Sequence, residues 1–68
     1  MESVYKIVEL VGTSPNGWEE AVQNVVTKAT ESLRDIRIVE VQSLDARITD
    51  GKIVAYRAKV KLSFKFEA

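Results

Sequence analysis

The clearest pattern in the chain is an alternation of apolar and polar residues in IVAYRAKVKLSFKF, residues 53–66. Apolar side chains occupy the even positions from Val54 to Phe66, whereas Arg57, Lys59, Lys61, Ser63 and Lys65 occupy odd ones. Successive side chains of a β-strand point to opposite faces, so this period of two predicts one long strand with its even-numbered face buried. Such a strand needs neighbouring strands on its edges and a layer over its apolar face.

Two further segments are rich in β-branched residues and predict the neighbouring strands, residues 4–11 (VYKIVELV) and residues 36–48 (IRIVEVQSLDARI). Asp50-Gly51 separates the second of these segments from the long strand. This dipeptide suits a type I′ turn, in which both central residues have positive φ, so it predicts an antiparallel hairpin.

The segment between the first two strands predicts one helix. Apolar residues recur there at three- and four-residue spacing and form one stripe, namely Trp18, Ala21, Val22, Val25, Val26, Ala29 and Leu33. Ser14 followed by Pro15 has the composition of an N-cap and a first helical residue, so we expect the helix to begin there. The stripe is the expected cover for the sheet.

A helix between the first two strands makes them parallel, and the hairpin makes the second strand antiparallel to the third. Both conditions are met if the third strand lies in the middle. The predicted fold is therefore α+β, a β-α-β-β single domain over residues 1–68 with a three-stranded sheet in the order 1-3-2 on one helix.

Size and composition add an expectation of self-association. A 68-residue domain has a core worth only about 3–5 kcal/mol, and this chain has no Cys and no His with which to form disulfides or the usual zinc sites. The formal net charge is zero, and no apolar run is long enough to span a bilayer. We expect a cytoplasmic oligomer with neither a membrane nor a nucleic-acid partner.

The residue types argue against an enzyme, because the common nucleophile–base pairs require His or Cys. The loop GTSPNG lacks the spacing and the lysine of a phosphate-binding loop, and a turn explains it. The basic row on the long strand is expected to pair with Glu9, Glu40 and Asp45 across the sheet. Trp18 heads the helical stripe, which favours packing in the core or between subunits over ligand stacking.

The segments VYKIVELVGTSP, IRIVEVQS and AYRAKVKLSFKFEA, together with the helix and the Asp-Gly turn, resemble the dodecins over essentially the whole chain. Dodecins are small flavin-binding proteins whose β-α-β-β subunits assemble as twelve copies into a hollow shell. The resemblance implies a homododecamer that binds riboflavin or FMN without catalysing a reaction.

Two positions depart from the flavin-binding pattern of that family. Where flavin-binding dodecins have a ring-stacking Trp and a ring-binding Gln, this chain has Ile38 and Arg57. Isoleucine offers no π-face, and arginine offers hydrogen-bond donors only. In these two features, and in Trp18, the chain is similar to a subgroup of the calcium-dodecin type.

Three readings of function therefore stand after the sequence alone. One is a shell that binds or sequesters a small ligand, and another is a calcium-binding shell without flavin, for which Glu40, Asp45 and Asp50 are candidate ligands because hard cations prefer oxygen. The third is a purely structural oligomer. Flavin reductase activity is the enzyme alternative, and the missing acid–base residues argue against it.

Overall fold

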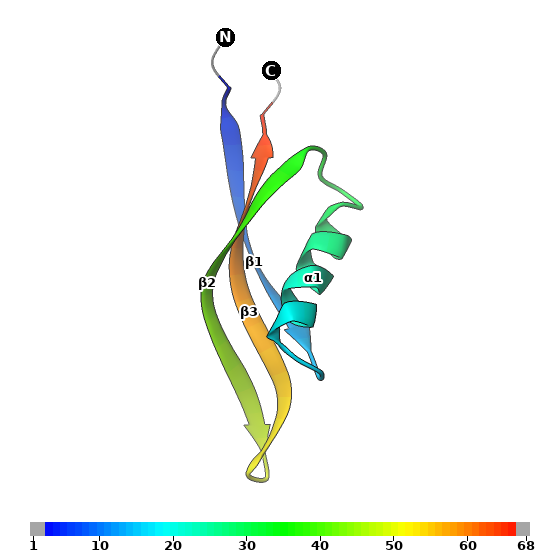
Figure 1. Cartoon of the computed structure of the whole chain (residues 1–68), viewed down its shortest axis with the longest axis vertical. Coiled ribbons are helices and arrows are strands. Elements are labelled where there is room, and N and C mark those ends of the chain that lie inside the picture. Colours follow the sequence, from blue (N-terminus) through cyan, green and yellow to red (C-terminus); the bar gives the residue numbers. More distant parts are fainter. Residues whose placement is uncertain (1–2, 67–68) are drawn as a thin grey trace.

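The computed structural model describes residues 3–66, so both ends of the predicted domain lie outside the described residues. The elements follow the order β1 (Tyr5–Ser14), α1 (Trp18–Ala29), β2 (Ile36–Thr49) and β3 (Lys52–Lys65). The three strands form one sheet in the order β1-β3-β2, and β3 pairs antiparallel with both neighbours. Figure 1 shows α1 lying against one face of this sheet. The predicted fold class, strand order and single covering helix are confirmed.

The hairpin between β2 and β3 turns where the Asp-Gly dipeptide predicts. Asp50 has φ 52° and Gly51 has φ 75°, so both central residues have the positive φ that a type I′ turn requires. Thr49 and Lys52 are opposite each other on either side of the turn. The bounds of β2 and β3 lie within one residue of the predicted ones.

The core lies between α1 and the middle of β3. In residues 3–66, the buried apolar side chains come from three positions of α1 and three of β3, namely Ala21, Val25, Ala29, Ala58, Val60 and Leu62. The spacing of four residues on α1 and of two on β3 is the spacing of one face in each element. The apolar stripe and the even-numbered face of β3 therefore meet as predicted.

Gly12 allows α1 to approach β1 closely. A Cβ atom built on Gly12 would collide with the Val25 side chain and with the Ala21 carbonyl oxygen. Gly12 pairs with Ala58 of β3, so two small residues side by side form the floor on which the helix rests. Because Gly12 has no Cβ atom, the helix can lie this close to the sheet.

The predicted start of the helix is wrong. Ser14 remains in β1, where it pairs with Tyr56 and is only 2% exposed, and α1 begins at Trp18 after Gly17 as N-cap. The Ser14 hydroxyl accepts a hydrogen bond from the Asn16 amide at 2.9 Å, so it closes the strand-to-helix turn instead of capping the helix. Pairing with β3 continues β1 to Ser14, three residues past the predicted end.

The subunit is elongated. Its Cα extents are 53 × 20 × 14 Å, and its radius of gyration is 14.0 Å, whereas a globular chain of 68 residues has about 11 Å. The β2–β3 hairpin extends beyond the first turn of α1 and the end of β1 (Figure 1). The even face of β3 is consequently buried only beneath the helix, and Val54 and Phe66 are 38% and 49% exposed.

We predict that Gly12→Ala destabilises the fold by about 1–3 kcal/mol, the usual cost of overpacking, because the helix must move away from β1 to admit the methyl group. Gly17→Ala is the matched control, since a Cβ at Gly17 meets nothing within 4 Å and its φ of 168° is extended. Urea unfolding of both variants measures the difference. Equal stability of the two variants would contradict this account of Gly12.

Candidate functional site

The candidate residues on the strands share the face of the sheet opposite to α1, here called the outer face. Ile38 pairs with Ser63, Glu40 with Lys61, and Asp45 with Arg57. Directly opposed residues of an antiparallel pair lie on the same face, and these partners in β3 are odd-numbered, whereas the helix covers the even-numbered ones. The outer face therefore carries Ile38 and Arg57, the positions predicted to contact a ligand, and two of the three candidate metal ligands.

The strongest polar contact on this face joins Arg57 to Asp45. Arg57 Nε donates to Asp45 Oδ1 at 2.7 Å, and Arg57 Nη2 donates to Asp45 Oδ2 at 2.9 Å. This geometry is the bidentate pairing in which a guanidinium matches both oxygens of a carboxylate. Both side chains are about half exposed, at 49% and 53%.

The pair affects the titration of both groups. The hydrogen bonds from Arg57, assisted by its positive charge, hold the pKa of the Asp45 carboxyl below its usual value. The hydrogen bonds to Asp45, assisted by the carboxylate charge, raise the pKa of Arg57 above its ordinary value. Asp45 is thus a carboxylate whose charge is already matched inside the chain.

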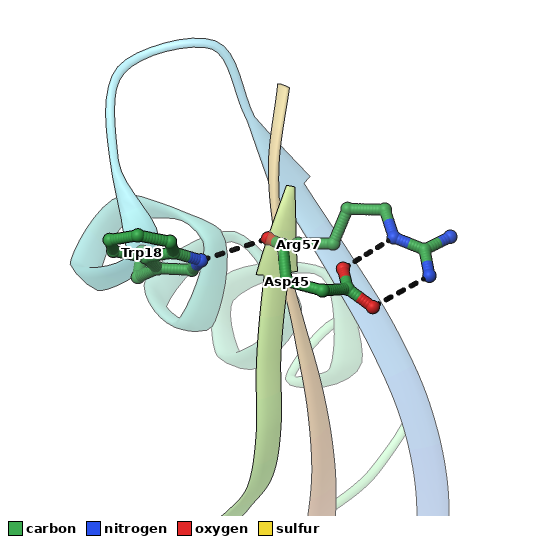
Figure 2. A network of polar contacts seen from close by, with 3 residues as sticks. All are labelled: Trp18, Asp45 and Arg57. Atoms are coloured by element: carbon green, nitrogen blue, oxygen red, sulfur yellow. Dashed lines mark hydrogen bonds and ion pairs between the residues drawn. The ribbon is translucent and has the colours of Figure 1, made fainter. Parts of the chain in front are cut away.

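The same aspartate is held from the other side of the sheet by Trp18. The Trp18 indole Nε1–H donates to the Asp45 backbone carbonyl at 2.9 Å, across 27 positions of sequence. Figure 2 shows the indole on one side of β2 and the Arg57–Asp45 pair on the other. The Trp18 ring also meets Tyr56 edge-on, with centroids 4.9 Å apart and planes at 75°. These contacts tie the first residue of α1 to β2 and β3.

Trp18 was predicted to pack in the core or between subunits, and its contacts within the chain are to the hairpin. Its side chain nevertheless remains 39% exposed at the edge of the core. The hydrogen bond to Asp45 was not foreseen from the sequence. The sequence gives one indication of this contact, a tryptophan at the start of the helix. Only the strand register identifies Asp45 as its hydrogen-bond partner.

Ile38 and Arg57 do not meet within one copy of the chain. Ile38 is opposite Ser63, six residues along β3 from Arg57, which corresponds to about 20 Å at 3.3–3.4 Å per residue. Ile38 is 57% exposed and offers an aliphatic surface. A pocket that uses both residues has to be formed by two copies.

The three candidate metal ligands are likewise separated. Glu40 and Asp45 are opposite Lys61 and Arg57, four residues apart on β3, which is about 13 Å, and Asp50 occupies the hairpin turn. Within residues 3–66 of one copy, no three His, Cys, Asp or Glu side chains are close enough to hold a metal ion together. The candidate carboxylates stay a prediction, and a site made from them needs more than one copy.

The basic row forms the cross-strand ion pairs expected of it at two positions. Arg57 pairs with Asp45, and Lys59 Nζ lies 3.8 Å from Glu9 Oε1 on β1. Opposite charges alternate across the outer face, which supports the reading of the row as an ion-paired surface. In the described part of the chain, no helix combines the length and the apolar character needed to cross a bilayer.

Comparison with known proteins gives a consistent result over nearly the whole chain. The family model Dodecin matches residues 4–67. The calcium dodecin of Mycobacterium tuberculosis is 40% identical over 63 residues, which are 93% of this chain and 89% of that protein. The dodecin of Thermus thermophilus is 36% identical over 67 residues, covering 98% and 97% of the two chains.

Solved structures agree with the sequence comparison. The dodecin from Streptomyces coelicolor superimposes with a TM-score of 0.93 at 38% identity and covers 97% of this chain and 94% of its own. The crystal structure of the M. tuberculosis calcium dodecin gives a TM-score of 0.84 at 42% identity, with 96% and 93% covered. With a family match over almost every residue and the same β-α-β-β fold, the chain belongs to the dodecin family.

Proposed function

We propose that this protein forms a homododecameric shell that binds a small ligand or cation without catalysing a reaction. Membership of the dodecin family supports the shell, and the absence of His and Cys from the sequence supports a role in binding. The chain's own surface supports assembly. Its accessible area is 5243 Å², about 900 Å² more than the roughly 4,300 Å² of a folded monomer of 7.6 kDa.

The outer face does not fit a flavin bound in the family's stacked manner. The observation that carries this conclusion is the bidentate Arg57–Asp45 pair, which occupies the guanidinium at the position of the family's ring-binding Gln. An arginine cannot accept a hydrogen bond from a flavin ring N–H, because its guanidinium offers donors only. Ile38 supplies no aromatic surface for the ring.

We propose a calcium ion as the ligand, as in the calcium dodecin of M. tuberculosis. The M. tuberculosis relative is a calcium-chelating protein whose crystal structure contains a calcium-binding site. In this chain, Glu40, Asp45 and Asp50 would supply oxygen ligands from several copies, because one copy does not bring them together. Asp45 would enter such a site only by exchanging part of its pairing with Arg57 for the metal.

We predict that the wild-type protein quenches riboflavin fluorescence poorly, and that Ile38→Trp combined with Arg57→Gln raises riboflavin affinity at least tenfold. Stacking on an aromatic side chain is worth about 1–3 kcal/mol per ring, which corresponds to about one to two orders of magnitude in affinity. The Ile38→Trp change alone should give the larger share. Fluorescence titration on the assembled protein measures both effects.

Val39→Trp is the matched control for this experiment, because Val39 follows Ile38 on β2 but pairs with Leu62 and so lies on the opposite face. It should leave riboflavin affinity unchanged. Tight riboflavin binding by the wild type, or no gain in an intact double variant, would show that Ile38 and Arg57 do not determine flavin affinity.

We predict that calcium raises the melting temperature of the assembly and that a chelator lowers it. A ligand that binds only the folded state stabilises it by RT ln(1 + [L]/Kd), about 2.7 kcal/mol at a hundredfold excess over Kd. Asp45→Asn should reduce the calcium-dependent shift. Glu31→Gln, which changes an exposed carboxylate paired with Lys28 on α1, should not.

Melting curves that coincide in calcium and in chelator would contradict calcium binding. If riboflavin also fails to bind, the purely structural shell becomes the supported function. A shift that survives Asp45→Asn unchanged would retain calcium as ligand and exclude Asp45 from its site.

A further inference from the structure

The turn between β1 and α1 contains a dipeptide with a reactivity of its own, Asn16-Gly17. Asparagine is a thermolabile residue, because the backbone nitrogen of the next residue can attack its side-chain amide carbon and displace ammonia. Glycine in that next position hinders the attack least, since it has no Cβ atom. The other asparagine of the chain, Asn24, is followed by the β-branched Val25. The sequence context therefore favours the reaction at Asn16.

The start of α1 leaves this dipeptide outside the helix. Because α1 begins at Trp18, Asn16 lies exposed in the turn, and Gly17 is the N-cap with an extended φ of 168°. A Cβ atom built on Gly17 would meet nothing within 4 Å, so the space beside this residue is open. Residues 16–20 line a hollow on the surface, which gives water access to the same place.

The attacking nitrogen is free of hydrogen bonds in the part of the chain that the structure describes. Among residues 3–66, the Gly17 amide donates to no acceptor, whereas the amide of Asn16 donates to the Ser14 hydroxyl at 2.9 Å. The first amides of a helix have no partner within that helix. The Gly17 nitrogen can therefore react without first losing a hydrogen bond to the protein.

Asn24 has the opposite environment and serves as an internal control. It lies in the middle of α1, where the amide of Val25 takes part in the helical hydrogen bonds. Its own side chain is held as well, because Asn24 Nδ2 donates to the Thr13 carbonyl at 3.0 Å. Attack on Asn24 would require the helix to open.

One contact restrains the Asn16 side chain. Its Nδ2 group donates to both carboxylate oxygens of Glu20, Oε1 at 3.2 Å and Oε2 at 3.0 Å. Both side chains are exposed, so water competes for these bonds, and one such bond changes an equilibrium by about fivefold. The Glu20 contact therefore slows rotation of the side chain toward Gly17 without preventing it.

We infer that Asn16 is a site of spontaneous deamidation. The Gly17 nitrogen loses its proton to solvent and forms a bond to Asn16 Cγ, the Cγ–Nδ2 bond breaks, and Nδ2 takes a proton from solvent and leaves as ammonia. The product is a cyclic imide. One water molecule then opens this ring at either carbonyl and gives aspartate or isoaspartate. Water is the only co-reactant, and nothing is oxidised or reduced.

The product differs from the present turn in charge and in hydrogen bonding. Either acid adds one negative charge to a chain whose formal net charge is zero. A carboxylate at residue 16 cannot donate to Glu20, so repulsion between like charges replaces the two hydrogen bonds. In the proposed shell every copy would carry this site, and the particle would become more acidic as it ages. The reaction itself needs only one copy.

Incubation of the wild-type protein at mildly alkaline pH tests this inference. Isoelectric focusing should show a more acidic form that accumulates with time, and peptide mass spectrometry should find the acid at residue 16 and not at Asn24. Gly17→Ala should form this acid about tenfold more slowly, because its methyl group hinders the attacking nitrogen. Its fold should be unchanged, since the added Cβ meets nothing. Asn16→Gln should form no acid at residue 16 over the same period.

Glu20→Ala tests the restraint on Asn16. It removes both hydrogen bonds and should raise the rate of acid formation about fivefold, the value of one exposed hydrogen bond. Glu19→Ala is the matched control, because it removes the adjacent carboxylate, which makes no hydrogen bond to Asn16 in the described structure. Far-UV circular dichroism confirms the fold of each variant.

Acid at residue 16 that forms more slowly in Gly17→Ala supports the inference. A folded wild type that gains no acid there, over a period in which Asn16 reacts in the urea-unfolded protein, overturns it. Acid found only at other residues overturns it as well. Equal rates in Glu20→Ala and Glu19→Ala would contradict the restraint by Glu20. A monomeric wild type that forms acid at residue 16 would keep this inference and overturn the proposed shell.

Discussion

Burial of the middle of β3 beneath α1 is the interaction on which the rest of this structure depends. Ala58, Val60 and Leu62 are fully buried, and they contact a helix whose own buried residues are small or β-branched. The close approach at Gly12 makes this contact tight. Because the helix is only 12 residues long, it covers the centre of a sheet whose two longest strands have 14 residues each. The helix therefore covers the middle of the sheet and leaves the ends of the sheet exposed.

That incomplete coverage connects the stability of the subunit to its assembly. A chain with a small core and a radius of gyration well above that of a globular protein leaves large apolar side chains open on the hairpin and along β1. In the proposed shell, neighbouring copies supply the missing layer. The part of the β2–β3 hairpin beyond Tyr56 has only two strands, so assembly would add stability there that one copy lacks.

Asp45 links the helix to the outer face of the sheet. Its backbone carbonyl accepts the Trp18 indole on the helix side, and its carboxylate is paired with Arg57 on the outer face. The chain keeps the dodecin fold, while Arg57, at the position predicted to match the family's ring-binding Gln, carries a charge that Asp45 neutralises. This change, together with Ile38, is the physical basis for favouring a ligand other than a stacked flavin.

The sequence by itself determined the fold class, because period-two patterning, one apolar helical stripe and an Asp-Gly turn each favour a single local structure. It did not determine the start of α1, since Ser14 forms a pair with β3 that local capping preferences do not contain. Nor did it determine the site. Counting back from the Thr49–Lys52 pair places Asp45 opposite Tyr56, but a register shift between Arg47 and Ile48 moves it opposite Arg57 and onto the outer face. A one-residue shift exchanges the faces of a strand, so pairing along the whole sheet, and not any local pattern, brought Asp45, Arg57 and Trp18 together.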